Sequence, residues 1–179
     1  SKIKGVAWLR LLYAYPRALP PGLVELLAEG GRVLPYLDVP IQHIHPRFLR
    51  GMGRHGGAQE VEELLLGLQG KIPGLVLRTT AIVGFPGETD AEFEMLLDFV
   101  RRVRFHHLGA FLYSPEEGTP AAKLRPRVSK KVAGQRLDHL LAVQAEVSAE
   151  RNREFLGRTL DILVDGLNEE GEPVGRTYG

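Results

Sequence analysis

The sequence contains no cysteine, no long apolar run and no marked excess of one charge. Without cysteine, the chain itself cannot supply a disulfide, a zinc–thiolate site, a cysteine nucleophile or the usual ligands of an iron–sulfur cluster. Its longest apolar stretch, residues 75–85, is broken by Arg78 and two threonines and falls short of the roughly 18 apolar residues of a membrane helix. The 23 basic and 22 acidic residues argue against a protein that coats nucleic acid. We therefore expect no membrane partner and a cytoplasmic location.

Both ends of the sequence indicate a part of something longer. The chain begins at Ser1 rather than at methionine, and it stops at residues 176–179 with no closing helix or completed sheet. We expect the natural polypeptide to extend beyond this stretch.

Strand-like and helix-like segments alternate through most of the chain. Apolar strand patterns cover residues 6–15, 33–41, 75–83 and 108–113. Helical patterns cover residues 22–29, 46–54, 58–69, a segment that starts with the capping box Thr89–Glu92, and 129–155. This alternation predicts an α/β fold with a parallel sheet. The pattern is consistent both with a segment of a barrel and with an open sheet.

The pattern changes after Gly157. Residues 159–164 alternate between polar and apolar, residues 168–171 read as a turn, and residues 173–177 read as a returning strand. Two strands alone are marginally stable, so we expect the first hairpin of a small β domain. The domain boundary is predicted near residues 155–157, which separates a domain of residues 1–156 from one that begins with residues 157–179.

Ligands of parallel sheets bind at the carboxyl ends of the strands, so the segments that end the strands are the candidates for a site. These segments are polar, aromatic or glycine-rich, and comprise residues 13–16, 38–43, 80–88 and 113–120. We expect them to converge on one pocket. Asp38 and Gln42 have the chemistry to hydrogen-bond a ribose or an amino-acid group, or they are polar residues of a surface loop.

Gly84 and Gly87 lie between a strand and the capped helix. One interpretation is close approach of the backbone to a ligand, with free helix amides facing an anion or dipole. The simpler interpretation is a tight turn that requires positive φ.

Two histidines, His43 and His45, are spaced like a pair that ligates one metal at the end of a barrel strand. The alternative is that His43 is a pocket or surface residue and that His45 enters the helix beginning at Pro46. His106 and His107 lie at the amino end of their strand, which is the wrong edge for a shared site. We predict no metal ligand in this chain and keep a barrel metal hydrolase as an alternative.

Arginines gather in residues 47–54 and 101–104. Solvated helix faces explain them most simply, and a docking surface for RNA or a ribonucleoprotein is the alternative.

Four segments together resemble the radical S-adenosylmethionine (SAM) methylthiotransferases. They match in order and spacing and extend over nearly the whole chain: WLRLLYAYP (residues 8–16), YLDVPIQH (36–43), IVGFPGET (82–89) and FLYSPEEGTP (111–120). The tail, residues 158–178, is similar to the start of the TRAM domain, a small β barrel through which family members engage macromolecular substrates. The resemblance implies the later part of a partial TIM-barrel-like radical SAM domain, followed by a truncated TRAM domain.

Three features favour the branch of this family that modifies a ribosomal protein over the branch that modifies tRNA. Gln42 is followed by His43 rather than by Ser-Gly-Ser, Glu116 and Glu117 stand where the tRNA branch tends to carry an arginine, and Ala81 stands where it tends to keep an aspartate. The resemblance therefore implies methylthiolation of an aspartate in a small-subunit ribosomal protein. That protein or the ribosome is the implied partner, with contact to RNA through the TRAM domain.

Family members use SAM and two [4Fe–4S] clusters. Their cysteines lie in an amino-terminal domain and in a Cys-x-x-x-Cys-x-x-Cys loop, one cluster cleaving SAM to the 5′-deoxyadenosyl radical and the other taking part in sulfur insertion. This chain has no cysteine. We therefore expect no cluster, no catalytic residue and no methylthiotransferase activity in the isolated chain.

The resemblance also implies a SAM-side pocket. In it, Asp38 and Gln42 face the ribose or methionine part of SAM, and Arg10 meets its carboxylate. The adenine side is implied to comprise Ile82, Val83, Gly84 and Tyr113.

Three further alternatives stay open. The chain could belong to a tRNA methylthiotransferase of the same family, or could be a non-catalytic module that docks a ribosome or RNA. Because a barrel without its first strands exposes an edge, the chain could also fail to fold stably alone.

Overall fold

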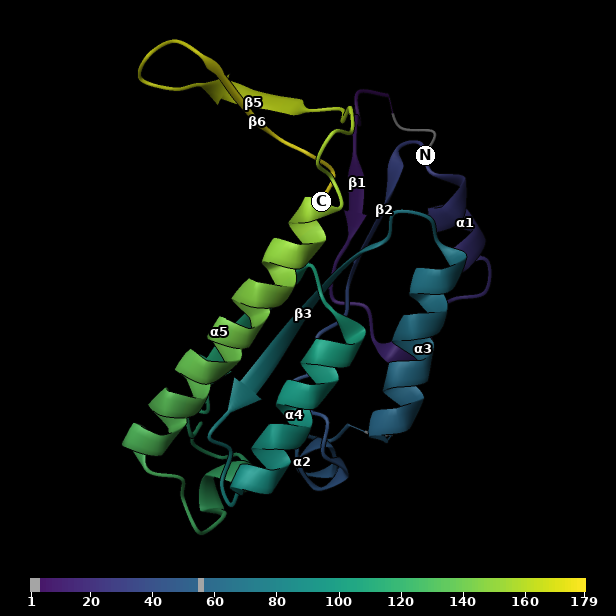
Figure 1. Cartoon of the computed structure of the whole chain (residues 1–179). Helices are drawn as coiled ribbons and strands as arrows, with labels where there is room; N and C mark the ends of the chain where they lie inside the picture. The colour runs from purple at the N-terminus through teal and green to yellow at the C-terminus, as the bar shows by residue number, and fades with distance from the viewer. Residues whose placement is uncertain (1–3, 55–56) are drawn as a thin grey trace.

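The computed structural model describes residues 4–54 and 57–179 of the chain. Its main feature is a sheet of four parallel strands in sequential order, which confirms the predicted α/β class (Figure 1). The strands are β1 (Leu9–Leu11), β2 (Val33–Asp38), β3 (Val76–Val83) and β4 (His107–Leu112). The helices are α1 (Leu23–Glu29), α2 (Pro46–Gly51), α3 (Ala58–Lys71), α4 (Asp90–Val103) and α5 (Lys130–Arg153), with short 3-10 turns η1 (Pro16–Ala18) and η2 (Pro120–Lys123).

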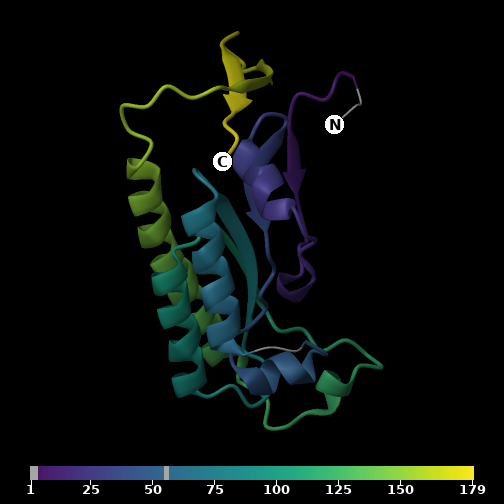
Figure 2. The ribbon, with the colours of Figure 1, turned by 90° about the vertical axis from the view of Figure 1, so that its right-hand side faces the viewer.

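The alternation of side chains along β3 separates two faces of the sheet. Thr79, Ala81 and Val83 are buried on the side covered by the helices, whereas Arg78, Thr80 and Ile82 are only partly buried on the other side. The core between sheet and helices draws buried apolar residues from α1, α3, α4 and α5. The second face, here called the open face, is free of these helices (Figure 2). In a closed barrel this face would line the interior.

The predicted capping box starts α4 as expected. The Thr89 side chain accepts a hydrogen bond from the Glu92 amide, and the Glu92 carboxylate accepts one from the Thr89 amide. These two bonds satisfy amides that a helix start otherwise leaves unpaired.

The first strand is much shorter than the predicted residues 6–15. It comprises Leu9–Leu11 and has a register irregularity against β2. It is an edge strand with β2 as its one neighbour, and Tyr13 then turns the chain with a φ of 58°. The apolar composition of the segment therefore continues beyond the paired residues into a turn, where Leu12 and Tyr13 are exposed.

The predicted hairpin is present as β5 (Leu163–Leu167) and β6 (Pro173–Arg176), which pair antiparallel. Its first strand begins at Leu163 rather than at residue 159. The hairpin exposes large apolar side chains, with Leu167 70% and Ile162 61% exposed. It lies at the amino edge of the sheet, at the end opposite to α2 (Figure 1). The domain boundary at residues 155–157 stays a prediction.

None of the helices in residues 4–54 and 57–179 combines the length and the apolar character required to span a membrane.

Candidate functional site

The carboxyl ends of β2, β3 and β4 meet at one edge of the sheet, beside α2 and the segment after β4 (Figures 1 and 2). Gln42 lies in the middle of this edge. Its amide donates to the Thr80 carbonyl at 2.8 Å, and its carbonyl accepts from the Ile82 amide at 2.7 Å. A φ of 66°, unusual for a residue with a side chain, accompanies these two bonds. The β2–β3 pairing thus continues past the end of β2 and holds Gln42 at the edge.

On one side of Gln42 lies a mainly apolar cavity of about 600 Å³, here called the apolar cavity. Its lining includes Ile82 from β3 and Phe85, Phe111 and Tyr113 from the two strand ends. The Tyr113 amide donates to the Val83 carbonyl at 2.9 Å, and its ring contacts that of Phe85 edge-on at 5.0 Å between centroids. The buried Tyr113 Oη has no hydrogen-bond partner within the described part of the chain. The cavity therefore offers aromatic walls to a ligand.

On the other side of Gln42 lies a second cavity of about 390 Å³, here called the cationic cavity. Arg54, Arg78, Thr80 and two tyrosines line it, and Gln42 and Phe111 belong to both cavities. The Arg54 Nη1 atom donates to the Pro40 carbonyl at 2.6 Å. Burial lowers the pKa of Arg54 from its ordinary value, since the guanidinium is partly removed from water.

Asp38 ends β2 and is fully buried. Its Oδ2 atom accepts from the Tyr13 amide at 3.2 Å and lies 3.4 Å from Arg78 Nη1. Its Oδ1 atom is buried without a hydrogen-bond partner among the residues the structure describes. Asp38 therefore holds the chain after β1 in place, and it lines neither of the two cavities.

Four of the seven predicted site residues are not among those that line the two cavities: Arg10, Asp38, Val83 and Gly84. The Arg10 Nη2 atom donates to the Thr177 carbonyl at 2.9 Å, and its guanidinium lies 4.5 Å from the centre of the Tyr36 ring. The Val83 side chain is fully buried in the core under the helices. Gln42, Ile82 and Tyr113 are brought together at the edge, whereas Arg10 is not, and Val83 can face a ligand only through its main chain.

Gly84 makes a turn against helix α5. It has a φ of 75°, and its amide donates to Glu88 Oε2 at 2.8 Å. A Cβ atom at this position would lie 2.6 Å from the Cβ of Ala133 on α5, closer than atoms can approach. Gly87 also has positive φ, at 79°. The positive φ of Gly84 and its close approach to α5 both require glycine, so the turn and the packing of α5 explain this residue.

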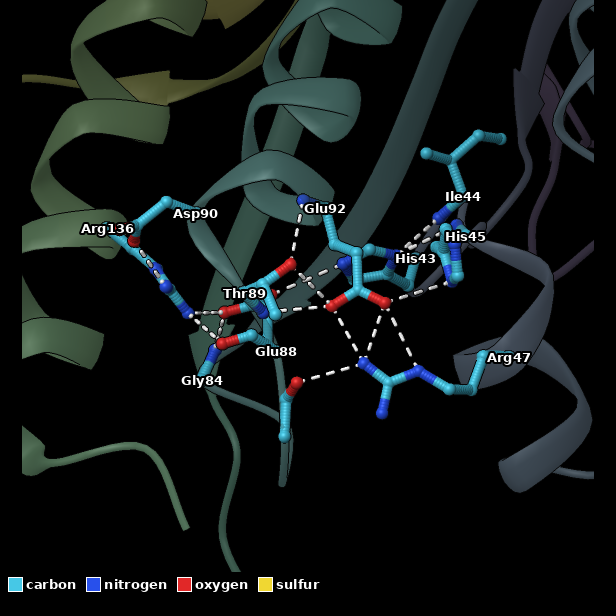
Figure 3. Close-up of polar contacts among 11 residues, drawn as sticks. His43, Ile44, His45, Arg47, Gly84, Glu88, Thr89, Asp90, Glu92 and Arg136 are labelled. Carbon is cyan, nitrogen blue, oxygen red and sulfur yellow. Dashed lines mark hydrogen bonds and ion pairs between the residues drawn. The ribbon is translucent and has the colours of Figure 1, made fainter. Parts of the chain in front are cut away.

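His43 is fully buried in a polar cluster behind the edge (Figure 3). Its Nδ1 atom accepts from the amides of Ile44 and His45, both at 2.9 Å, and its Nε2 atom lies 3.2 Å from Glu88 Oε1. This pattern places the proton on Nε2, where it is donated to the carboxylate. Because both ring nitrogens are engaged, His43 has no lone pair for a metal, which contradicts the metal-hydrolase alternative.

Glu88 joins the two strand ends to helix α5 (Figure 3). Its Oε2 atom accepts from Arg136 Nη1 at 2.6 Å, and the second nitrogen of Arg136 bonds Asp90 at the same distance. The side chain of Glu88 is fully buried, and that of Arg136 is 8% exposed. The buried ion pair thus connects the turn after β3, the loop after β2 and the long helix.

A second carboxylate beside this cluster, Glu92, is held by Arg47 at 2.6 and 2.7 Å and lies 3.4 Å from His45 (Figure 3). Burial raises the pKa of Glu92, but hydrogen bonds from Arg47 and Thr89 outweigh it and bring the pKa to about 2. Burial lowers the pKa of His45. Glu92 is therefore ionised and tied to α2 at neutral pH.

The low pKa of Glu92 predicts a pH-dependent stability. Its contribution is complete above its ordinary pKa of 4.5 and is lost as the pH falls towards about 2. We expect Glu92→Gln to reduce the free energy of unfolding by about 2–3 kcal/mol at pH 6, with the difference vanishing near pH 2. Denaturant unfolding across this range measures it, with Glu94→Gln on the exposed side of the same helix as control. Parallel stability curves for wild type and Glu92→Gln would contradict the assignment.

Sequence reasoning missed Arg54 and Arg78 in the cationic cavity and Glu88 and Arg136 in the buried cluster. Arg54 and Arg136 lie in segments whose arginines were interpreted as solvated or as part of an amphipathic helix, so composition alone gave no signal. Arg78 could have been found, because it alternates with Thr80 and Ile82 along β3 and precedes a strand end.

Within residues 4–54 and 57–179, no three His, Asp or Glu side chains are grouped so that they could hold a metal ion. The chain also has no cysteine to ligate a cluster.

Parallel strands under a layer of helices, with two cavities of different chemistry at the carboxyl edge, define a ligand-binding domain of the barrel-related α/β class. The chain belongs to the Radical SAM superfamily, whose sequence profile matches residues 3–100.

Curated relatives extend this likeness over the whole chain. It is 45% identical to Ribosomal protein uS12 methylthiotransferase RimO of Carboxydothermus hydrogenoformans, over 99% of this chain and 41% of that protein. The proteins of the same name from a Synechocystis and an Anaeromyxobacter strain are each 47% identical over 96% of this chain, which covers 39% and 36% of their lengths. The chain thus spans about two fifths of the relatives it matches.

Two solved structures share the fold. The radical SAM enzyme coproporphyrinogen III oxidase (HemN) of Escherichia coli superposes with a TM-score of 0.62 at 19% identity, over 76% of this chain and 32% of HemN. The radical SAM methyltransferase TsrM of Kitasatospora setae gives 0.51 at 24% identity, over 64% of this chain and 22% of TsrM. At these identities the likeness concerns the fold.

Proposed function

We propose that this chain is the later part of the radical SAM domain, with the start of the TRAM domain, of a methylthiotransferase that modifies an aspartate of the small-subunit ribosomal protein uS12. The observation that carries the proposal is 45–47% identity, over 96–99% of the chain, to enzymes named for that reaction. The partner is then uS12, alone or in the ribosome, and the hairpin β5–β6 begins the domain that engages it or nearby RNA.

The residues at the carboxyl edge fit the adenosyl part of SAM. The apolar cavity presents the aromatic side chains of Phe85, Phe111 and Tyr113 for a flat base. Gln42, at the junction of the two cavities, offers hydrogen bonds to a ribose or an amino-acid group. When bound, SAM supplies the radical chemistry of the reaction. This chain's part is to bind and orient it and to exclude water from the adenosyl group.

The iron–sulfur clusters do not fit this chain, because cysteine is absent from it. No step of the reaction that involves a cluster is therefore assigned to these residues. The cluster ligands are expected in the remaining three fifths of a protein as long as the relatives.

The proposal is tested on the longer polypeptide that contains this chain, reconstituted with iron and sulfide and supplied with SAM, a reductant and uS12. We expect mass spectrometry of uS12 peptides to show one added methylthio group on an aspartate, and no reaction when the 179-residue chain replaces the longer polypeptide. Methylthiolation of tRNA with uS12 left unmodified would overturn the choice of substrate and favour the tRNA branch.

A further inference from the structure

The cationic cavity contains two guanidinium groups and no carboxylate among its lining residues in the described part of the chain. Asp38, outside the lining, is paired with Arg78 at 3.4 Å. The cavity therefore favours an anionic group, in contrast to the apolar cavity across Gln42.

Arg54 is the cation of this pair that lacks a compensating charge. Its contacts are the Pro40 carbonyl at 2.6 Å and the ring of Tyr15, 5.8 Å from the guanidinium carbon. No described carboxylate lies within ion-pair distance of it, although the side chain is half-buried. A guanidinium partly removed from water without a counter-charge gains most from a carboxylate ligand, which it can bind through two parallel hydrogen bonds.

We propose that Arg54 is the counter-ion for the carboxylate of the amino-acid side chain that is modified, and so a residue that determines substrate specificity. The inference rests on the proposed function, because it requires a carboxylate-bearing residue of a protein as the substrate. The cationic cavity then binds a carboxylate, which is the group that distinguishes an aspartate from an asparagine or from a neutral nucleobase.

SAM also has a carboxylate, so the ligand of Arg54 is either that group or the carboxylate of the substrate. The position of Arg54 favours the substrate. Arg78 lies on β3 with its side chain on the open face of the sheet, whereas Arg54 lies between α2 and α3, in the connection that follows the carboxyl end of β2. In this class of fold the active site is built from the strand ends and the loops that follow them, and the loops are the more variable part, which favours the substrate as the ligand of Arg54. The cavity beside Arg54 is bordered by Tyr13, which is 79% exposed, so a polypeptide can reach it from solvent.

The test uses the reconstituted longer enzyme with uS12 and with uS12 whose target aspartate is replaced by asparagine. In the wild type we expect the aspartate substrate to be preferred. We expect Arg54→Gln to raise the KM for uS12 about 10- to 100-fold, the range for a lost charge-assisted hydrogen bond, and to abolish the preference over asparagine. The KM for SAM should change less than about threefold, within the scatter of a neighbouring substitution. Arg54→Lys should restore part of the preference, and Arg50→Gln on the exposed side of α2 serves as the matched control.

The outcomes separate the inference from the proposed function. If Arg54→Gln raises the KM for SAM and leaves the aspartate preference intact, the arginine binds SAM and the assignment to the substrate is overturned. If the variant remains folded with unchanged kinetics for both ligands, Arg54 is not a ligand-binding residue. If the wild-type enzyme does not modify uS12, the proposed function itself is refuted, and this result is independent of the Arg54 variants.

Discussion

Replacement of Glu88 by leucine is expected to lower the free energy of unfolding of the chain by about 3–5 kcal/mol. The carboxylate is fully buried and pairs with Arg136 at 2.6 Å, with His43 at 3.2 Å and with the Gly84 amide at 2.8 Å. Its removal leaves the buried guanidinium of Arg136 with the exposed Asp90 as its remaining carboxylate, besides the main-chain carbonyl of residue 88 at 3.0 Å. It also leaves the Nε2 proton of His43 without its acceptor. An unpaired charge or donor in the interior costs far more than the pair itself contributed. Denaturant unfolding of Glu88→Leu and wild type measures the loss.

The neighbouring Asp90 provides a control for this prediction. It also bonds Arg136 at 2.6 Å, but its side chain is 95% exposed. Water can replace it, so Asp90→Ala should cost no more than about 1 kcal/mol. A double substitution, Glu88→Leu with Arg136→Met, should recover much of the stability because it removes the orphaned charge along with its partner. Equal losses for Glu88→Leu and Asp90→Ala would contradict the role given to burial.

The buried cluster also explains how the site is held. His43 follows Gln42 directly, and its ring fixes the amides of the next two residues. Gln42 itself adopts positive φ and separates the two cavities. A strained conformation of this kind persists only where its surroundings impose it. The His43–Glu88 contact, anchored on α5 through Arg136, supplies that constraint from the side away from the ligand.

Most of the fold could be predicted because local signals agreed with the tertiary structure. The capping box at Thr89 marks the start of α4 within one residue. The apolar run of residues 75–83 correctly predicts a strand, but it fits a strand covered on both faces, whereas helices cover only one face of β3 and Arg78, Thr80 and Ile82 on the other face are partly buried. The first strand was predicted too long, since Tyr13 turns the chain within an apolar segment. The side chains of Leu12 and Tyr13 are exposed although they continue the apolar run, so composition does not locate the end of the strand.

The site could be predicted only where it follows from strand ends. Gln42, Ile82 and Tyr113 come together because carboxyl ends of parallel strands share an edge. Arg10 contacts Tyr36 and Thr177 instead of lying at this edge. The alternation of side chains along a strand predicts on which face a residue lies, but not how near it is to the carboxyl end. Arg54 and Arg136 reach the strand ends from other segments, and their contacts depend on tertiary packing that no local pattern contains.

Gly84→Ala is expected to destabilise the chain by about 3 kcal/mol, since it combines positive φ with overpacking. The φ of 75° disfavours any residue with a side chain, and the new Cβ would lie 2.6 Å from the Cβ of Ala133. The close approach also sets how near α5 lies to β3, and hence the reach of Arg136 towards Glu88. We therefore expect the loss to exceed what strain at an isolated turn would give, and thermal or denaturant unfolding measures it.

The two causes can be separated by a second substitution on α5. Ala133→Gly alone should cost about 1 kcal/mol, because glycine weakens a helix interior. It also removes the atom that the new Cβ would strike, so the double variant should be no less stable than Gly84→Ala. Gly134→Ala, where a Cβ meets nothing within 4 Å, should instead stabilise the same helix. Strictly additive losses in the double variant would show that backbone strain alone requires Gly84, and that contact with α5 contributes nothing.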